Sequence, residues 1–158
     1  RVLDGYELGW VEADEETVQQ AVGVLRGGDP DALFVYLGNP DETSHEYGSI
    51  GAEYRASIAL ADRHVGRLVA ALRQRPTYAQ EDWLILSSTD HGRRTDGGHG
   101  GDTPEERTIY FLAGGPAVHA DLVPDSVFIV DVAVTALTHL GIPIDPAWDL
   151  DGRPVGVR

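Results

Sequence analysis

The run "DWLILSS", residues 82–88, decides the fold class, because a short apolar stretch of this composition is typical of a buried β-strand. Two similar runs occur elsewhere in the chain, "ALFVYL" at residues 32–37 and "TIYFLAGG" at residues 108–115. "VFIV", at residues 127–130, is a candidate for a short fourth strand. Strands that are apolar along their whole length are typical of a sheet covered on both faces.

Helical patterns lie between and around these runs. We expect helices over residues 14–26, with Asp14 as the N-cap, over residues 49–75, and over residues 131–140. The long middle helix has one apolar stripe, made of Tyr54, Ile58, Ala61, Val65, Leu68 and Leu72.

This helix joins the runs at 32–37 and 82–88, so these two strands should be parallel. We therefore predict one α/β segment over residues 1–158, a largely parallel sheet flanked by helices. Thr103 and Glu106 also have the spacing of a capping box, which predicts a short helical turn before residues 108–115.

Composition narrows the possible functions. The 158 residues include 12 basic and 26 acidic side chains, a net charge of −14, which disfavours binding to nucleic acid. No apolar run approaches the ~20 residues of a membrane span. The chain has no Cys, so a metal could be held only by Asp, Glu and His. It has no Met and begins at Arg1, so we expect a piece of a longer protein.

Polar clusters follow the predicted strands. Asp41 and His45 come after residues 32–37, Asp90 and His91 come directly after residues 82–88, and His99 lies on a Gly-rich loop. Ligands of parallel α/β sheets bind beyond the carboxyl ends of the strands, so these five side chains should converge. Imidazole and carboxylate together suit Zn²⁺ and other first-row divalent ions. Taken singly, each residue could instead be a turn former or an exposed loop side chain.

Three cations, Arg93, Arg94 and Arg107, are nearest to these residues in sequence. They are the candidates for a substrate-binding anion clamp, with a solvated or structural role as the alternative. Asp96, within "TDGG", is expected to form a turn.

These motifs resemble those of the alkaline phosphatase superfamily, especially its type I phosphodiesterase/nucleotide pyrophosphatase and sulfatase-like branches. "PDETSHEYG" resembles the D-x-x-x-H-x-x-G motif, "SSTDHG" the second metal motif, and "GGHGG" the loop with the last histidine ligand. The ending "DVAVTALTHLGIPIDPAWDLDGRPVG" is similar to the closing helix and tail of that family, so the resemblance covers residues 30–155. Ser44 departs from the pattern, because the phosphodiesterase branch usually has Gly at this place.

The resemblance implies that Asp41, His45 and His99 hold one metal ion, and that Asp90 and His91 hold a second. It implies an alkaline-phosphatase-like fold and hydrolysis of a small anionic phosphate or sulfate ester with two divalent ions, Zn²⁺ being favoured over Mn²⁺ or Mg²⁺. The nucleophile, a Thr or Ser, and a further Asp are expected upstream of Arg1. The chain would then be the C-terminal part of a catalytic domain and inactive in isolation.

Three other functions remain open at this point. A phosphomutase of the same superfamily would need a phosphate pocket rich in Arg or Lys. A non-catalytic metal-binding module would use the ligands only to hold loops together. An interaction domain would carry the Asp and His cluster without any metal. Compartment and oligomeric state are left open.

Overall fold

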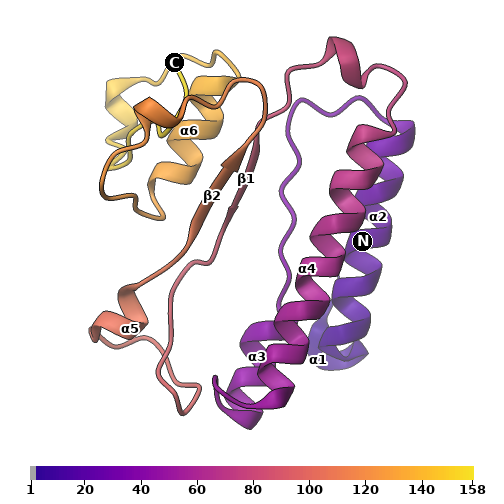
Figure 1. The fold of residues 1–158 in the computed structure, drawn as a ribbon, viewed down its shortest axis with the longest axis vertical. Helices are drawn as coiled ribbons and strands as arrows, with labels where there is room; N and C mark the ends of the chain where they lie inside the picture. The colour runs from indigo at the N-terminus through magenta and orange to yellow at the C-terminus, as the bar shows by residue number, and fades with distance from the viewer. Residues whose placement is uncertain (1–2) are drawn as a thin grey trace. The chain divides into compact units, whose positions relative to one another are not determined.

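The computed structural model describes residues 3–158 as a mixed helix-and-strand fold with two compact units (Figure 1). The first unit comprises the chain up to Ala79 together with Arg93–His99. The second comprises Gln80–Gly92 and Gly100–Arg158. Short 3₁₀ turns lie at Tyr78–Gln80, Ala120–Leu122 and Pro146–Trp148.

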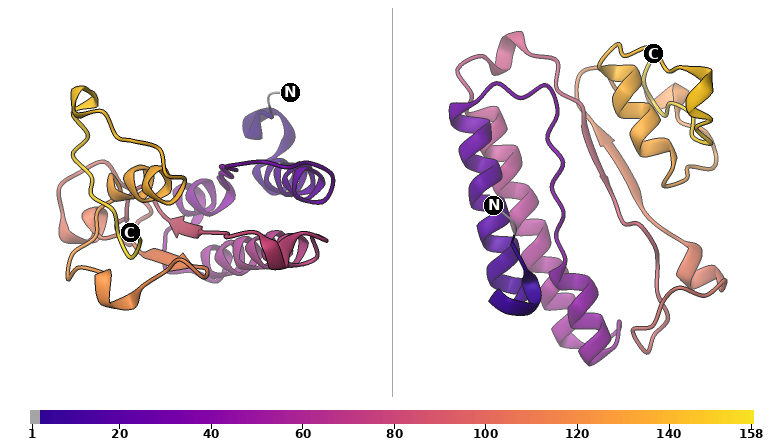
Figure 2. Two further views of the ribbon diagram at one scale, coloured as in Figure 1. Left: turned by 90° about the horizontal axis from the view of Figure 1, so that it is seen from above. Right: turned by 180° about the vertical axis from the view of Figure 1, so that it is seen from behind.

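The first unit is helical. It contains α1 (Gly5–Leu8), α2 (Trp10–Gly27), α3 (Asn39–Tyr47) and α4 (Ala52–Arg73). Helices α2 and α4 run side by side, as Figures 1 and 2 show, and α3 packs against both. Their shared core is small and apolar, and consists of Ala13, Val18, Ala21, Leu25, Ala71 and Leu72.

The predicted starts and faces of these helices need correction. Helix α2 begins at Trp10, after Gly9, so Asp14 is not its N-cap but a buried residue of its second turn. Ile58 and Val65 of the predicted stripe of α4 are 46% and 36% exposed. The buried face of α4 instead contains Ser57, His64 and Ala71, which are seven residues apart and therefore lie on the same side of the helix. Helix α2 packs against this side.

The apolar run at residues 32–37 is not a strand in this structure. It has no ladder partner in the described part of the chain, and Phe34 is 90% exposed. A strand needs a hydrogen-bonded neighbour, which an apolar pattern alone does not provide. The polar segment that follows, expected as a loop, is the helix α3.

The second unit contains one small sheet within the described residues. Strands β1 (Ile85–Ser88) and β2 (Phe111–Gly114) confirm the predicted runs, but they pair antiparallel, with Ile85 opposite Gly114. A largely parallel sheet is therefore not seen here. Residues 127–130 lead through a turn into α6 and form no strand.

Two further helices complete the second unit, α5 (Pro104–Arg107) and α6 (Asp131–His139). The capping box predicted for α5 is confirmed, since Thr103 and Glu106 each accept the other's backbone N–H. The C-terminal tail packs on α6, where the backbone N–H of Val155 donates to Thr135 Oγ1 at 3.0 Å and Val134 is buried. Among the described residues, no helix combines the length and apolar character required to cross a bilayer.

Candidate metal site

Helix α3 places two potential ligands on one face. Asp41 and His45 are four residues apart, about one turn of an α-helix, so their side chains lie one above the other. The distance from His45 Nε2 to Asp41 Oδ2 is 3.3 Å. Pro40 lies in the first turn of the helix, where a backbone N–H has no partner within the helix, so its missing N–H costs nothing. The Asp41 carboxylate, also in the first turn, interacts favourably with the positive end of the helix dipole.

A third ligand arrives on the loop Arg93–His99, which docks on the C-terminal end of α3. The Ser49 backbone N–H donates to the Thr95 carbonyl at 3.1 Å, and Ser49 Oγ donates to the Arg94 carbonyl at 2.6 Å. Gly97 has a positive φ of 88°, and a Cβ there would run into the Ser44 carbonyl oxygen of α3. The loop can approach α3 this closely only because residue 97 is glycine.

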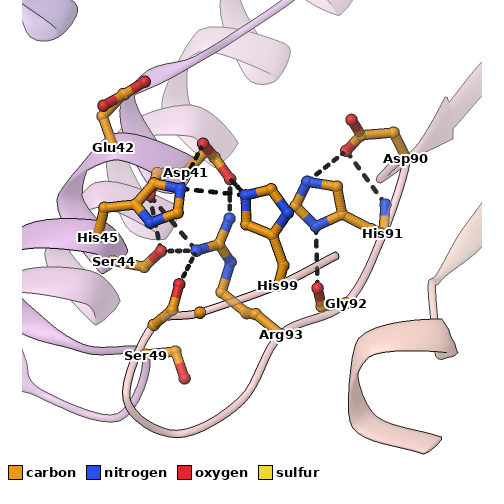
Figure 3. Close-up of polar contacts among 12 residues, drawn as sticks. Asp41, Glu42, Ser44, His45, Ser49, Asp90, His91, Gly92, Arg93 and His99 are labelled. Atoms are coloured by element: carbon orange, nitrogen blue, oxygen red, sulfur yellow. Dashed lines mark hydrogen bonds and ion pairs between the residues drawn. The ribbon is translucent and has the colours of Figure 1, made fainter. Parts of the chain in front are cut away.

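Docking of this loop brings Asp41, His45 and His99 together. Their ligand atoms all lie within 4.8 Å of one another, and Figure 3 shows both imidazoles facing the Asp41 carboxylate. His45 Nε2 is 3.0 Å from His99 Nε2, and His99 Nε2 is 3.6 Å from Asp41 Oδ1. Ligand atoms about 2.0–2.1 Å from a tetrahedral Zn²⁺ are about 3.3–3.4 Å apart. Spacing and donor types therefore both fit a small divalent ion.

Arg93 ties the ligands to their scaffold. Its guanidinium contacts the Asp41 carboxylate and the Ser44 hydroxyl, and it donates to the Gly97 carbonyl at 2.8 Å. Ser44 is fully buried, and its Oγ donates to the Asp41 carbonyl at 2.7 Å. The Arg93 side chain is 9% exposed, and burial lowers its pKa. Ser44, the residue that departs from the family motif, thus uses its hydroxyl to hold Asp41 and Arg93 in place. The sequence did not suggest this role.

The other two candidate clamp residues have acidic partners. Arg94 Nε lies 3.3 Å from Asp96 Oδ1, and Arg107 Nη1 lies 3.1 Å from Asp102 Oδ1. The Gly98 N–H donates to Asp96 at 2.9 Å and, with Arg94, lowers the pKa of Asp96. Asp96 is therefore the turn former that was expected. An anion-binding role for Arg93, Arg94 or Arg107 stays a prediction.

Asp90 and His91 belong to the second unit, directly after β1. The His91 backbone N–H donates to Asp90 Oδ1 at 3.1 Å, and His91 Nδ1 lies 2.9 Å from the Gly92 carbonyl. A carbonyl oxygen can only accept, so Nδ1 donates to it, and the other ring nitrogen, Nε2, lies 3.6 Å from Asp90 Oδ1. The pair presents one carboxylate and one imidazole nitrogen close together. That it shares a site with the other three ligands stays a prediction.

Sequence reasoning missed Asp14. Its carboxylate accepts the backbone N–H groups of Gly38 and Asn39, at 2.9 and 3.1 Å, where α3 begins. Burial raises the pKa of Asp14, and these two hydrogen bonds oppose the rise. A signal was present in the sequence, because Asp14 lies on the stripe of Val18 and Leu25, where an acid needs a partner.

Comparison with known proteins gives these residues a family context. The model of the type I phosphodiesterase / nucleotide pyrophosphatase family matches residues 4–96, and a domain of unknown function (DUF4983) matches residues 116–155. Venom phosphodiesterase 2 of Crotalus adamanteus is 36% identical over 63 residues, 40% of this chain and 8% of the snake protein.

Two other relatives match more of the chain. Alkaline phosphatase PhoD of Zymomonas mobilis is 29% identical over 118 residues, 71% of this chain and 19% of that protein. The catalytic subunit of GPI ethanolamine phosphate transferase 3 of Homo sapiens is 26% identical over 135 residues, 83% of this chain and 12% of that protein. No solved structure matches significantly.

The chain thus spans less than a fifth of the length of each of these relatives. The matched region of the phosphodiesterase model includes more than half of the chain, and with it Asp41, His45, Asp90 and His91. This chain belongs to the type I phosphodiesterase / nucleotide pyrophosphatase family, within the alkaline phosphatase superfamily.

Proposed function

We propose that this chain supplies metal ligands to a metal-dependent hydrolase of phosphate esters, with a phosphodiester or nucleotide pyrophosphate as the substrate class. One observation carries the proposal: a carboxylate and two imidazole nitrogens from α3 and the loop Arg93–His99 lie 3.0–3.6 Å apart. Catalytic zinc sites have three such protein ligands and keep a fourth position for water or substrate. The family and the names of its relatives support the same reaction class.

In this proposal Asp41, His45 and His99 hold one ion, Zn²⁺ being favoured over Mn²⁺ or Mg²⁺ by two nitrogen donors. The bound ion would polarise a phosphoryl oxygen and lower the pKa of an attacking hydroxyl. The two imidazoles bind as neutral rings through Nε2. Arg93 fixes the Asp41 carboxylate and links it to the loop that carries His99.

A second ion would be held by Asp90 and His91, whose carboxylate and Nε2 lie 3.6 Å apart. In sites with two ions, the pair clamps the attacking and leaving oxygens of an in-line displacement. The resemblance to the superfamily assigns a Thr or Ser nucleophile and one more Asp to this second ion. We propose that all five ligands of this chain serve one centre, set at the edge of a largely parallel sheet in the complete domain.

The substrate proposed is a small anionic ester. Two divalent ions would offset the charges of Asp41 and Asp90, so an anion can approach a protein whose net charge is −14. Arg93, Arg94 and Arg107 remain the proposed contacts for its charged oxygens. A sulfate ester is the alternative, because the sulfatase-like branch uses similar motifs.

A second candidate function is phosphoryl transfer to an alcohol instead of water. The observation in its favour is coverage: the transferase from Homo sapiens matches 83% of the chain, against 40% for the snake phosphodiesterase. Both reactions would use the same metal ligands and differ in the acceptor. Turnover of a diester to a phosphate monoester in water, without an added alcohol, would support hydrolysis over transfer.

Turnover of bis(p-nitrophenyl) phosphate by the full-length protein tests the proposal. We expect activity with added Zn²⁺ or Mn²⁺, loss of activity with a chelator, and loss on substitution His99→Ala. His119→Ala is the matched control, because His119 is an exposed loop residue of the second unit. Activity that persists in the His99→Ala variant, or after complete removal of metal, would show that the reaction does not depend on this site.

A further inference from the structure

The N-terminal end of α3 is capped by a different helix. The N-cap residue of α3 is Gly38, which has no side chain to offer. Asp14 of α2, 24 residues away in sequence, accepts the backbone N–H of Gly38 through Oδ1 and that of Asn39 through Oδ2. Asp14 is only 3% exposed, so its carboxylate accepts hydrogen bonds from the protein and not from solvent. The first N–H groups of a helix have no partner within the helix, and Asp14 satisfies two at this end.

An ordinary capping residue such as Ser or Asp at position 38 would require the Trp10 ring to move. A Cβ on Gly38 would collide with the ring of Trp10, which lies against it. Trp10 is four residues before Asp14 and shares its face of α2. Helix α2 therefore both disfavours a local capping side chain at Gly38 and provides the substitute.

This arrangement sets the direction and the rotation of α3. Two carboxylate oxygens hold two successive N–H groups, so the first turn of α3 is tied to α2 at two points. Asp41 and His45 follow within the next two turns, and successive residues of a helix are about 100° apart around its axis. The loop Arg93–His99 contacts the other end of α3, at Ser44 and Ser49, so a shift confined to the N-terminal end would move Asp41 and His45 relative to His99.

We propose that Asp14 is a positioning residue of the metal site: by capping α3 it aligns Asp41 and His45 with His99. The inference rests on the proposed metal site, but its geometric part can be measured without any metal. Substitutions of residues that orient metal ligands typically cost about 10- to 100-fold in metal affinity. The negative charge of Asp14 also interacts favourably with the positive end of the α3 dipole, so both its shape and its charge stabilise the start of α3.

The test compares Asp14→Asn and Asp14→Ala with Asp62→Asn in the full-length protein. Asn has the shape of Asp but can accept only one of the two N–H groups, and its amide NH₂ would face the other. Ala removes both acceptors. Asp62 is an exposed residue of α4, so Asp62→Asn is the matched control for loss of one carboxylate.

Three readouts are taken on each variant. The first is contact between the His45 and His99 rings, whose centroids are 4.9 Å apart, measured by NMR without metal on histidine-labelled protein. The second is the dissociation constant for Zn²⁺, with the visible spectrum of bound Co²⁺ as a report on ligand geometry. The third is the melting temperature, which shows whether each variant is folded.

We expect the ring contact to weaken and the Zn²⁺ dissociation constant to rise about 10-fold in Asp14→Asn and more in Asp14→Ala. Asp62→Asn should match the unsubstituted protein. A folded Asp14→Asn variant with an unchanged ring contact and unchanged Zn²⁺ affinity overturns the inference, since Asp14 would then have only a structural role. If the unsubstituted protein binds no Zn²⁺ but the ring contact is lost in Asp14→Asn, the proposed function fails and the positioning role stands.

Discussion

Replacing Gly97 by Ala should weaken metal binding, because Gly97 is where the loop carrying His99 touches α3. Its φ of 88° lies in a region that residues with a Cβ rarely adopt. An added Cβ would also overlap the carbonyl oxygen of Ser44, which already accepts the Gly48 N–H at the end of α3. The chain can relieve both problems only by moving the loop off the helix, and that movement would carry His99 away from Asp41 and His45.

The backbone alone gives an estimate of the effect, for a substitution whose strain is relieved when the loop leaves the helix. A left-handed conformation costs an L-residue about 1–2 kcal/mol relative to glycine. Since about 1.4 kcal/mol is a factor of ten in affinity, the Zn²⁺ dissociation constant should rise by about 5- to 30-fold. The overlap with the Ser44 carbonyl adds to this cost, because that oxygen belongs to a helix and cannot shift freely.

Gly100→Ala separates the two contributions. Gly100 has a φ of 91°, but nothing lies within 4 Å of the position that its Cβ would take. This variant has the backbone cost without the collision, so its effect on Zn²⁺ affinity should be smaller than that of Gly97→Ala. Competition with a chromophoric chelator measures both constants, and thermal melting confirms that both variants fold. Equal Zn²⁺ affinity for Gly97→Ala and the unsubstituted protein would refute the docking of the loop on α3.

Three further predictions concern the ligands, the bound metal and acid stability. His45→Ala should raise the Zn²⁺ dissociation constant by more than about 100-fold, because a ligand is lost and not merely tilted. The same chelator competition measures this constant, and an affinity equal to that of the His119→Ala control would contradict the ligand assignment. Zn²⁺ at 100 times its dissociation constant should stabilise the folded protein by about 2.7 kcal/mol, a rise in Tm of roughly 5–10 °C that EDTA reverses; identical melting curves with and without metal would count against the site. A hydrogen bond from Arg67 lowers the pKa of Glu15 from 4.5 to about 2, so its stabilising effect is complete above pH 4.5 and is lost as the pH falls toward 2. Glu15→Gln should flatten acid unfolding slightly in that window, since the exposed pair is screened by solvent, and an unchanged slope would mean that the pair contributes nothing.

The features that the sequence predicted well are local. Thr103 and Glu106 satisfy each other's backbone N–H three residues apart, so their capping box depends on nothing else in the chain. The end of α6 is similar, because Gly141 has the positive φ of 67° that terminates a helix. Patterns of this kind contain both partners of the interaction that they predict.

The convergence of Asp41, His45 and His99 was predicted for a reason that the structure does not show. The prediction relied on the carboxyl ends of parallel strands, yet residues 32–37 form no strand here. The three side chains meet because Asp41 and His45 are one turn apart on α3 and because Gly97 lets the loop dock there. The spacing in the sequence was informative, although the assumed scaffold was different.

The features that the sequence could not predict depend on distant partners. Asp14 was expected to cap its own helix, but it caps α3 across 24 residues, and no short pattern records that pairing. The apolar run with Phe34 has the composition of a strand, but only a neighbouring strand can make it one. The same limit applies to Arg93, whose contact with Asp41 spans 52 residues.

Anomalous diffraction from crystals of the Zn²⁺-loaded protein, recorded on both sides of the zinc absorption edge, tests the central claim most directly. We predict an anomalous peak from a zinc ion coordinated by the Asp41 carboxylate and by Nε2 of both His45 and His99, with zinc–ligand bonds of about 2.0–2.2 Å. The peak should vanish in crystals of the His99→Ala variant grown and loaded in the same way. Zinc bound elsewhere in the protein, with these three side chains unligated, would contradict the account.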